Sequence, residues 1–326
     1  MRRLNFPPRT RTHYKRRTPI LSSKLSVFRE LIGAKSRLFI TFALLVLYAS
    51  QRENVYRFIP RQVKELKRWR VDWHAAFEKA HTSKKYNDSC GELHLHIISL
   101  KRSASRLVST LASAQSQGLS VTVHTAVDGL DPFNHSDIIR YSGKKRLKKL
   151  SQLTNSNRAT LESLYSSHRK RQLPERIRSI LHERLRFGCY LSHVRLWEKL
   201  LSNDWPFMII LEDDVTLTPN FAEKFRLALK EAPFDWGLIY LNGCFQVFGP
   251  QIENNLLLSR GGLCTFGYAI SRAGADYFMK GDQLRSDKPI DHMMDEEVSL
   301  GRLSAFHTAQ VLVSTTSELS TLAYQM

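Results

Sequence analysis

Three consecutive acidic residues, Glu212, Asp213 and Asp214, follow directly on an apolar run at 208–211. A run of this length ahead of the turn signal at 218–220 predicts a buried strand. Carboxylates at the end of a strand lie at the edge of the sheet, where open α/β folds bind ligands. Adjacent anions repel one another, so we expect a divalent cation or an extensive hydrogen-bond network to hold them. A polar loop with solvated acids is the alternative.

A strand–helix–strand unit is predicted upstream of these acids. The strand at 93–100 is followed by a helix at 107–117 and a second strand at 120–126, which is the usual opening of a nucleotide-binding α/β domain. The chain has no Gly-x-Gly-x-x-Gly and no Walker sequence. Their absence argues against a Rossmann dinucleotide site and a P-loop.

Basic and acidic side chains flank the helix of this unit. Lys101, Arg102 and Arg106 precede it or begin it, where a diphosphate could meet the helix amino terminus. Ordinary solvation of a helix start is the alternative. Asp128 follows the second strand and suits a ribose or base contact, although a simple turn residue would look the same.

A second helix is predicted at 188–201, directly ahead of the acidic strand. Ser192 and His193 fall near its predicted start, where backbone N–H groups attract anions. A structural role for the histidine competes with a catalytic one. Further on, Ser271 is predicted to cap a helix. Asp291 begins an acidic cluster, which could equally be the acidic first turn of a helix.

The composition supports a folded enzyme-like body with basic additions. The chain has 326 residues, 42% of them hydrophobic, and a net charge of +19. The charge is concentrated in residues 1–50, where Glu30 is the sole acid, and in a basic segment at 137–186. We interpret that segment as an insertion of broken helix over one face; solvated charge is its default explanation, and acceptor binding is open. It lacks aromatic interleaving, so we predict no nucleic-acid partner.

The amino terminus combines a basic tail at 1–37 with an apolar segment at 38–50. The apolar run is short for a membrane-spanning helix, which needs about 20 residues. A thin internal membrane and snorkelling by Arg37 and Arg52 would accommodate it. We predict an uncleaved signal anchor with a cytosolic tail, followed by a stem at 51–90 and a luminal body at 91–326. A mitochondrial presequence and a buried helix are the alternatives.

Four cysteines are too few for a disulfide scaffold. Cys244 and Cys264 flank a predicted hairpin or loop and are the best candidates for one luminal pair. Glycosylation sequons begin at Asn87 and Asn134 and agree with a luminal body. No paired cysteine spacing supports structural zinc.

Five sequence blocks, taken together and in this order, resemble glycosyltransferase family 25, which includes bacterial lipooligosaccharide galactosyltransferases and the collagen galactosyltransferases. The blocks are 97–102 with 126–129, then 188–197, 210–215, 267–271 and 289–292. Ser99 departs from the pattern, because many relatives carry Asn there.

The resemblance implies a GT-A-type α/β fold with a mixed, mainly parallel sheet, and transfer of a hexose with inversion. The donor would be a UDP-sugar, with galactose the family's commonest theme, and the acceptor a hydroxyl of a glycan or glycoprotein. The enzyme would be a single-pass type II protein of the Golgi or endoplasmic reticulum membrane.

The resemblance also suggests roles for the candidate residues. Asp214 and then Glu212 would contact Mn²⁺ or Mg²⁺, and Asp213 would face the ribose or sugar. Asp291 would act as base on the acceptor hydroxyl. The groups that would stabilise the departing diphosphate are Lys101, Arg102 and the helix bearing Ser192 and His193.

Two other function classes stay open. One is a non-catalytic luminal binding or adhesion relative of the same fold. The other is a metal-dependent phosphohydrolase that uses the clustered acids.

Overall fold

The computed structural model describes residues 71–86, 92–153, 158–166 and 174–315. The predicted tail at 1–37, the signal anchor at 38–50 and most of the predicted stem lie outside these ranges. Across the described ranges, no helix is both long and apolar enough to cross a membrane.

A sheet of eight strands forms the centre of the described chain, in the order β2-β1-β3-β8-β5-β9-β7-β6. Its strands are β1 Leu95–Ser99, β2 Val121–Thr125, β3 Phe207–Glu212, β5 Leu238–Tyr240, β6 Phe248–Glu253, β7 Leu256–Ser259, β8 Gly267–Ser271 and β9 Ala305–Thr308. A separate pair joins β4 Val215–Leu217 to β10 Val313–Thr315.

The mixed character predicted for the sheet is confirmed. Parallel neighbours are confined to β2-β1-β3 and to β5-β9. The remaining neighbours are antiparallel, because β7 and β8 each run against the strands on both of their sides. Six of the eight strands run in one direction and β7 and β8 are reversed, which gives three parallel and four antiparallel pairings.

Helices cover both faces of the sheet, which explains the continuous apolar run in β3. Phe207, Ile209 and Leu211 of this strand point into a core shared with α5 Ala104–Gln115 and α10 Phe221–Glu231. Met208 and Ile210 point the other way. They pack with α9 Glu175–Ser202, α11 Arg272–Lys280 and α12 Ile290–Ser299. β3 is therefore fixed from both sides up to the acids at its end.

The helix predicted at 188–201 begins earlier, at Glu175, and runs through 28 residues. Ser192 and His193 consequently lie in its interior, so the prediction that they sit at a helix start with free N–H groups is wrong. Gly188 suggested the helix boundary, but it serves a close approach instead. A Cβ there would lie 2.5 Å from the carbonyl oxygen of Val127, in the loop after β2.

The basic segment at 137–186 is helical, as expected for broken helix. It contains α6 His135–Tyr141, α7 Lys144–Leu150, the 3₁₀ turn η2 Ser151–Leu153, α8 Arg158–Ser166 and the first turns of α9. Arg146 of α7 is completely buried and donates to Glu183 and to the carbonyls of Ser286 and Lys288. This arginine fastens the segment to the chain just ahead of α12.

Residues assigned to the stem pack on the body. α4 Trp73–Thr82 places Trp73 and Phe77 against the core, and the Arg260 guanidinium lies 5.5 Å from the Trp73 ring centroid. Tyr86 donates its backbone N–H to Ala232. The described part of the predicted stem therefore contains a helix that packs on the core.

Candidate functional site

A cavity of about 400 Å³ lies at the carboxyl ends of β1 and β3, beside α9 and the first turns of α5 and α12. Eight of the ten predicted site residues line it: Arg102, Arg106, Ser192, His193, Glu212, Asp213, Asp214 and Asp291. Lys101 is exposed on the 3₁₀ turn η1 Lys101–Ser103, and Asp128 is buried in the turn after β2. Neither of these two belongs to the cavity wall.

Asp213 and Asp214 form a buried turn between β3 and β4, and Arg106 from the first turns of α5 binds both. Its Nη2 lies 2.7 Å from Asp213 Oδ1 and its Nη1 lies 3.3 Å from Asp214 Oδ2. Ser99 Oγ donates to Asp213 Oδ2 at 2.8 Å. Burial raises the pKa of Asp213, while Ser99 and Arg106 oppose that rise. The predicted hydrogen-bond network around the acids is present.

Helix α5 holds the same turn through its backbone. Thr110 Oγ1 lies 2.9 Å from the carbonyl oxygen of Asp213 and 2.8 Å from that of Val215, and it accepts from the Val215 N–H at 3.2 Å. One turn further along α5, Ser113 accepts from the N–H of Leu217 at 2.9 Å. These bonds fix where the two aspartates point.

Glu212 ends β3 and projects into the cavity, where Thr265 donates to its Oε1 at 2.9 Å. Burial raises the pKa of Glu212 to about 7, and the negative charge of Asp214 contributes. Asp213 and Asp291 raise it further. This end of the cavity is therefore rich in negative charge despite Arg106.

His193 is a neutral hydrogen-bonding group. Its Nδ1 lies 2.9 Å from the hydroxyl of Tyr268, which also accepts from Trp197 Nε1 at 3.0 Å. Because the indole can only donate, the tyrosine proton is available to His193 Nδ1, and in that arrangement the ring proton lies on Nε2. Burial lowers the pKa of His193 to about 3. The residue suits hydrogen-bond donation into the cavity better than proton uptake.

Ser192 and Asp128, both predicted to contact a ligand, form hydrogen bonds with other residues of the protein. The Ser192 hydroxyl accepts from the Val127 N–H and donates to the Gly188 carbonyl, both at 2.8 Å. Asp128 accepts from Arg102 Nε and from the Leu130 N–H, each at 3.0 Å. Asp128 thus matches the turn residue that the sequence left open, and the Ser192 hydroxyl joins α9 to the loop after β2.

Asp291 lies in the first turn of α12 and accepts from the N–H of Cys264 at 3.3 Å and from that of His292 at 2.8 Å. Cys264 is joined to Cys244 by a disulfide, the pair that the sequence favours. The loop that carries Cys264 also carries Thr265, the partner of Glu212. One cross-linked loop thus contacts two of the cavity's carboxylates.

Comparison with known proteins places these features in a family. The sequence model described as Glycosyltransferase family 25 (LPS biosynthesis protein) matches residues 92–294. The chain belongs to glycosyltransferase family 25. The matched range of this family 25 chain contains all the residues that line the cavity.

Similar curated proteins include both enzymes and proteins named inactive. Procollagen galactosyltransferase 2 of Mus musculus is 27% identical over 218 residues, which are 64% of this chain and 31% of that protein. The inactive glycosyltransferase 25 family member 3 of Mus musculus is 26% identical over 235 residues, 69% of this chain and 35% of that protein. The family 25 chain therefore aligns with about a third of these relatives' length.

Several residues of the site escaped the sequence reasoning, among them cavity-lining residues and Tyr268, which contacts His193 from outside the cavity wall. Thr265 and Tyr268 act through single hydroxyl contacts with Glu212 and His193, and no local pattern announces such contacts. Arg186 and Cys189, in contrast, could have been identified from the sequence. They precede His193 by seven and four residues, a spacing that places all three on one helix face.

Divalent metal binding was predicted for Asp214 and Glu212. Within the described ranges, no group of three or more His, Cys, Asp or Glu side chains is arranged to hold an ion. The donor chemistry nevertheless fits, since Mn²⁺ and Mg²⁺ prefer carboxylate oxygens, and Mg²⁺ in such sites uses one or two carboxylates together with substrate phosphates. Burial is the main cause of the raised pKa of Glu212, and the negative charges of Asp214, Asp213 and Asp291 add to it. A cation would balance those charges.

Proposed function

We propose that this family 25 chain is an inverting, GT-A-type glycosyltransferase that moves a hexose from a UDP-sugar to a hydroxyl of a glycan or glycoprotein. Galactose is the sugar we favour, because similar curated proteins are named procollagen galactosyltransferases. The observation that carries the proposal is the buried acidic turn, braced by Arg106 and open to a cavity at the carboxyl edge of the sheet. Ligands bind at this edge in open α/β folds.

The charged residues divide the work in this proposal. Asp214 and Glu212 would hold Mn²⁺ or Mg²⁺, which would supply positive charge against the donor diphosphate. Arg106 keeps Asp213 and Asp214 in place and adds positive charge nearby. Asp291, which lines the cavity from α12, would take the proton from the acceptor hydroxyl.

His193 has a different part in the same reaction. It is held neutral by burial and oriented by Tyr268, so we assign it hydrogen-bond donation to the bound sugar or diphosphate. A neutral donor of this kind supports developing negative charge without a proton transfer.

We place the reaction in the lumen of the Golgi or endoplasmic reticulum, with a type II anchor at 38–50. The Cys244–Cys264 disulfide supports an oxidising compartment. The anchor itself rests on sequence alone.

A non-catalytic relative of the same fold is the second candidate. Similar proteins that are named inactive favour it, as does the pairing of Arg106 with two of the acids intended for ligand binding. In that case the cavity would bind sugar nucleotides or glycans without turnover.

A donor screen distinguishes the candidates. UDP-galactose, UDP-glucose and UDP-N-acetylglucosamine should be tested by calorimetry and for UDP release, each with and without Mn²⁺. The proposed enzyme binds one donor more tightly with Mn²⁺ and releases UDP. Binding without release supports the non-catalytic relative, and phosphate release from simple esters indicates a phosphohydrolase. No donor binding under any condition contradicts the proposal.

A further inference from the structure

One face of α9 forms a long wall of the cavity. The α9 residues on this wall are His182, Leu185, Arg186, Cys189, Ser192 and His193. They follow the three-and-four spacing of a single helix face. Arg186 and His193 are seven residues apart, which corresponds to about 10 Å along the helix axis.

Arg186 differs from the other arginines of the cavity. Arg102 pairs with Asp128, and Arg106 pairs with the acidic turn. Arg186 is half-buried and lines the cavity, yet among the described residues it has no ion pair and no side-chain hydrogen bond. Its guanidinium therefore keeps its full capacity to bind an anion.

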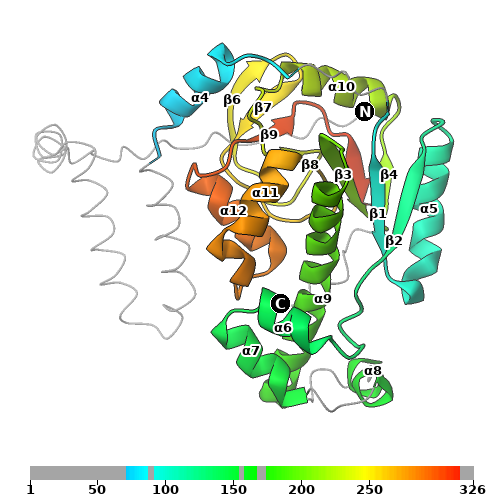
Figure 1. Cartoon of the computed structure of the whole chain (residues 1–326). Helices are drawn as coiled ribbons and strands as arrows, with labels where there is room; N and C mark the ends of the chain where they lie inside the picture. The colour runs from blue at the N-terminus through cyan, green and yellow to red at the C-terminus, as the bar shows by residue number, and fades with distance from the viewer. Residues whose placement is uncertain (1–70, 87–91, 154–157, 167–173, 316–326) are drawn as a thin grey trace, which may run out of the picture. The chain divides into compact units, whose positions relative to one another are not determined.

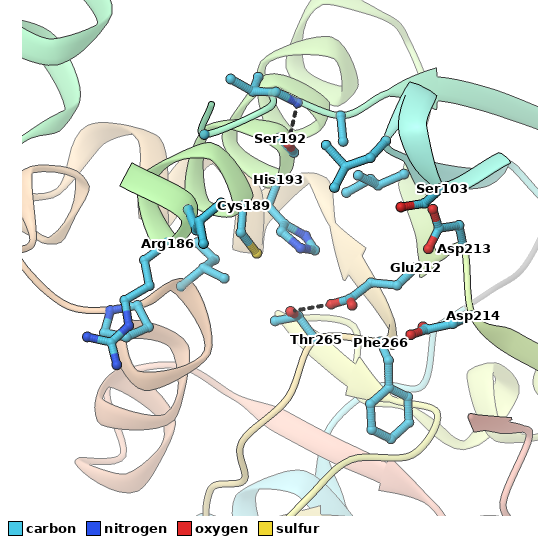
Figure 2. A pocket seen from close by; sticks show the side chains of 18 of the residues that line it. Ser103, Arg186, Cys189, Ser192, His193, Glu212, Asp213, Asp214, Thr265 and Phe266 are labelled. Atoms are coloured by element: carbon cyan, nitrogen blue, oxygen red, sulfur yellow. Dashed lines mark hydrogen bonds between the residues drawn. The ribbon is translucent and has the colours of Figure 1, made fainter. Parts of the chain in front are cut away.

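Arg186 also lies apart from the acidic turn. Figure 2 shows it on the opposite side of the cavity from Asp213 and Asp214, with Cys189 and His193 between them. The charges that oppose the raised pKa of Asp213 come from Arg106, not from Arg186. The cavity thus has an acidic end at the β3 turn and a cationic end at Arg186.

We propose that Arg186 binds an anionic group of the acceptor, namely a carboxylate on an acidic sugar residue. The inference rests on the proposed function, in which the acidic turn holds the donor diphosphate on the far side of His193 from Arg186. A group at the cationic end is then part of the acceptor. A guanidinium and a carboxylate form two parallel hydrogen bonds, which suits recognition of an acidic sugar.

The surface beside Arg186 supports an acidic acceptor. Helix α7 packs on α9 and exposes Lys144, Lys145 and Lys148. Lys149 of the same helix lies 4.0 Å from Glu183, one turn before Arg186. The three exposed lysines, on a helix packed against α9, would attract a negatively charged glycan.

The test compares a matched pair of acceptors on wild-type protein, Arg186→Gln and a control. The probes are p-nitrophenyl β-D-glucuronide, which carries a carboxylate, and p-nitrophenyl β-D-glucoside, which does not. Calorimetry in the presence of UDP measures their binding even if turnover is absent, and transfer from the selected donor gives kcat/KM. Arg178→Gln is the control, because Arg178 is an exposed α9 arginine that pairs with Glu175.

We expect wild-type protein to favour the glucuronide. Arg186→Gln should bind the glucuronide about 10- to 100-fold more weakly, which is the loss expected for one charge-assisted contact. It should leave the glucoside and the donor Kd unchanged, and Arg186→Lys should recover part of the loss. Arg178→Gln should behave as wild type.

Three results would overturn the inference while the proposed function stands. They are a wild-type protein without preference for the glucuronide, equal losses on both acceptors, and a weakened donor Kd, which would move Arg186 to the donor. Failure of wild-type protein to bind any donor would instead count against the proposed function.

Discussion

At the scale of single residues, each acid of the turn has a specific partner. Arg106 holds Asp213 and Asp214, and Thr265 holds Glu212. The sequence predicted the three acids and their place at a strand end, because both follow from the chain's order. It could not predict that Arg106, expected at a diphosphate, would bind the acids, since that contact joins residues more than 100 positions apart.

Replacement of Asp214 tests the acidic turn. Asp214→Asn should lower transfer by about 100-fold or more, because the carboxylate proposed to hold the ion is lost. Arg106 retains Asp213, so the unfolding temperature should change by less than about 4 °C. Both are measured by a transfer assay beside a circular-dichroism melt. Asp235→Asn, at a half-exposed ion pair with Lys79, is the control, and retained turnover in Asp214→Asn would remove the metal role.

Replacement of Tyr268 tests the bond that orients His193. Tyr268→Phe leaves the Trp197 indole N–H and His193 Nδ1 without their shared partner, so urea unfolding should show a loss of about 1–3 kcal/mol. The Tyr240 hydroxyl is buried with no hydrogen-bond partner among the described residues. Tyr240→Phe is therefore the matched control and should cost almost nothing. Equal losses in the two variants would mean that the shared bond has no stabilising role.

At the scale of elements, helices α5 and α9 supply much of the cavity wall. Periodicity predicted α5 and the second half of α9, since buried faces repeat every three to four residues. The start of α9 was misjudged because Gly188 resembles a helix boundary. Only the packed structure shows that Gly188 makes room for the Val127 carbonyl.

Replacement of Thr110 tests how α5 holds the acidic turn. Thr110→Val keeps the side-chain volume but removes the hydroxyl that accepts from Val215 and contacts the Asp213 carbonyl. The free energy of unfolding should fall by about 1–3 kcal/mol, and donor binding should weaken in calorimetry. Thr122→Val, on the exposed side of β2, should change neither quantity. Unchanged donor binding in a destabilised Thr110→Val would limit Thr110 to stability.

At the scale of the whole molecule, the core buries several polar rings. His96 and His307 are 2% and 1% exposed. Burial lowers their pKa from the ordinary 6.5 to about 3 for His96 and about 4 for His307. Composition alone gave no sign of this, because burial is decided by how the strands assemble.

These histidines predict a loss of stability in acid. As the pH falls below about 6.5, His96 and His307 become protonated in the unfolded chain. In the folded chain they bind a proton only near pH 3 and pH 4, respectively. The unfolded state then binds more protons, so stability is complete above pH 6.5 and falls by up to about 1.4 kcal/mol per pH unit for each such histidine. Urea midpoints at pH 7.0, 5.5 and 4.5 measure this.

A pair of variants assigns the effect. His307→Asn should flatten the dependence of the urea midpoint on pH, whereas His74→Asn, at an exposed position on α4, should leave it unchanged. A slope that is the same in His307→Asn and wild-type protein would show that His307 titrates equally in both states.

The sequence alone determined which residue types end the strands, the spacing of helices and strands, and the order of the blocks that identify the family. These properties depend only on the order of residues along the chain, so they are the same however the helices and strands pack. The tertiary structure alone decided that β8 runs against β3 and β5 and that Arg106 pairs with Asp213 and Asp214. It also decided that Arg186 faces the cavity with no ion-pair partner among the described residues. Such contacts depend on how distant segments meet, because strand direction and side-chain pairing are fixed by burial across the whole core.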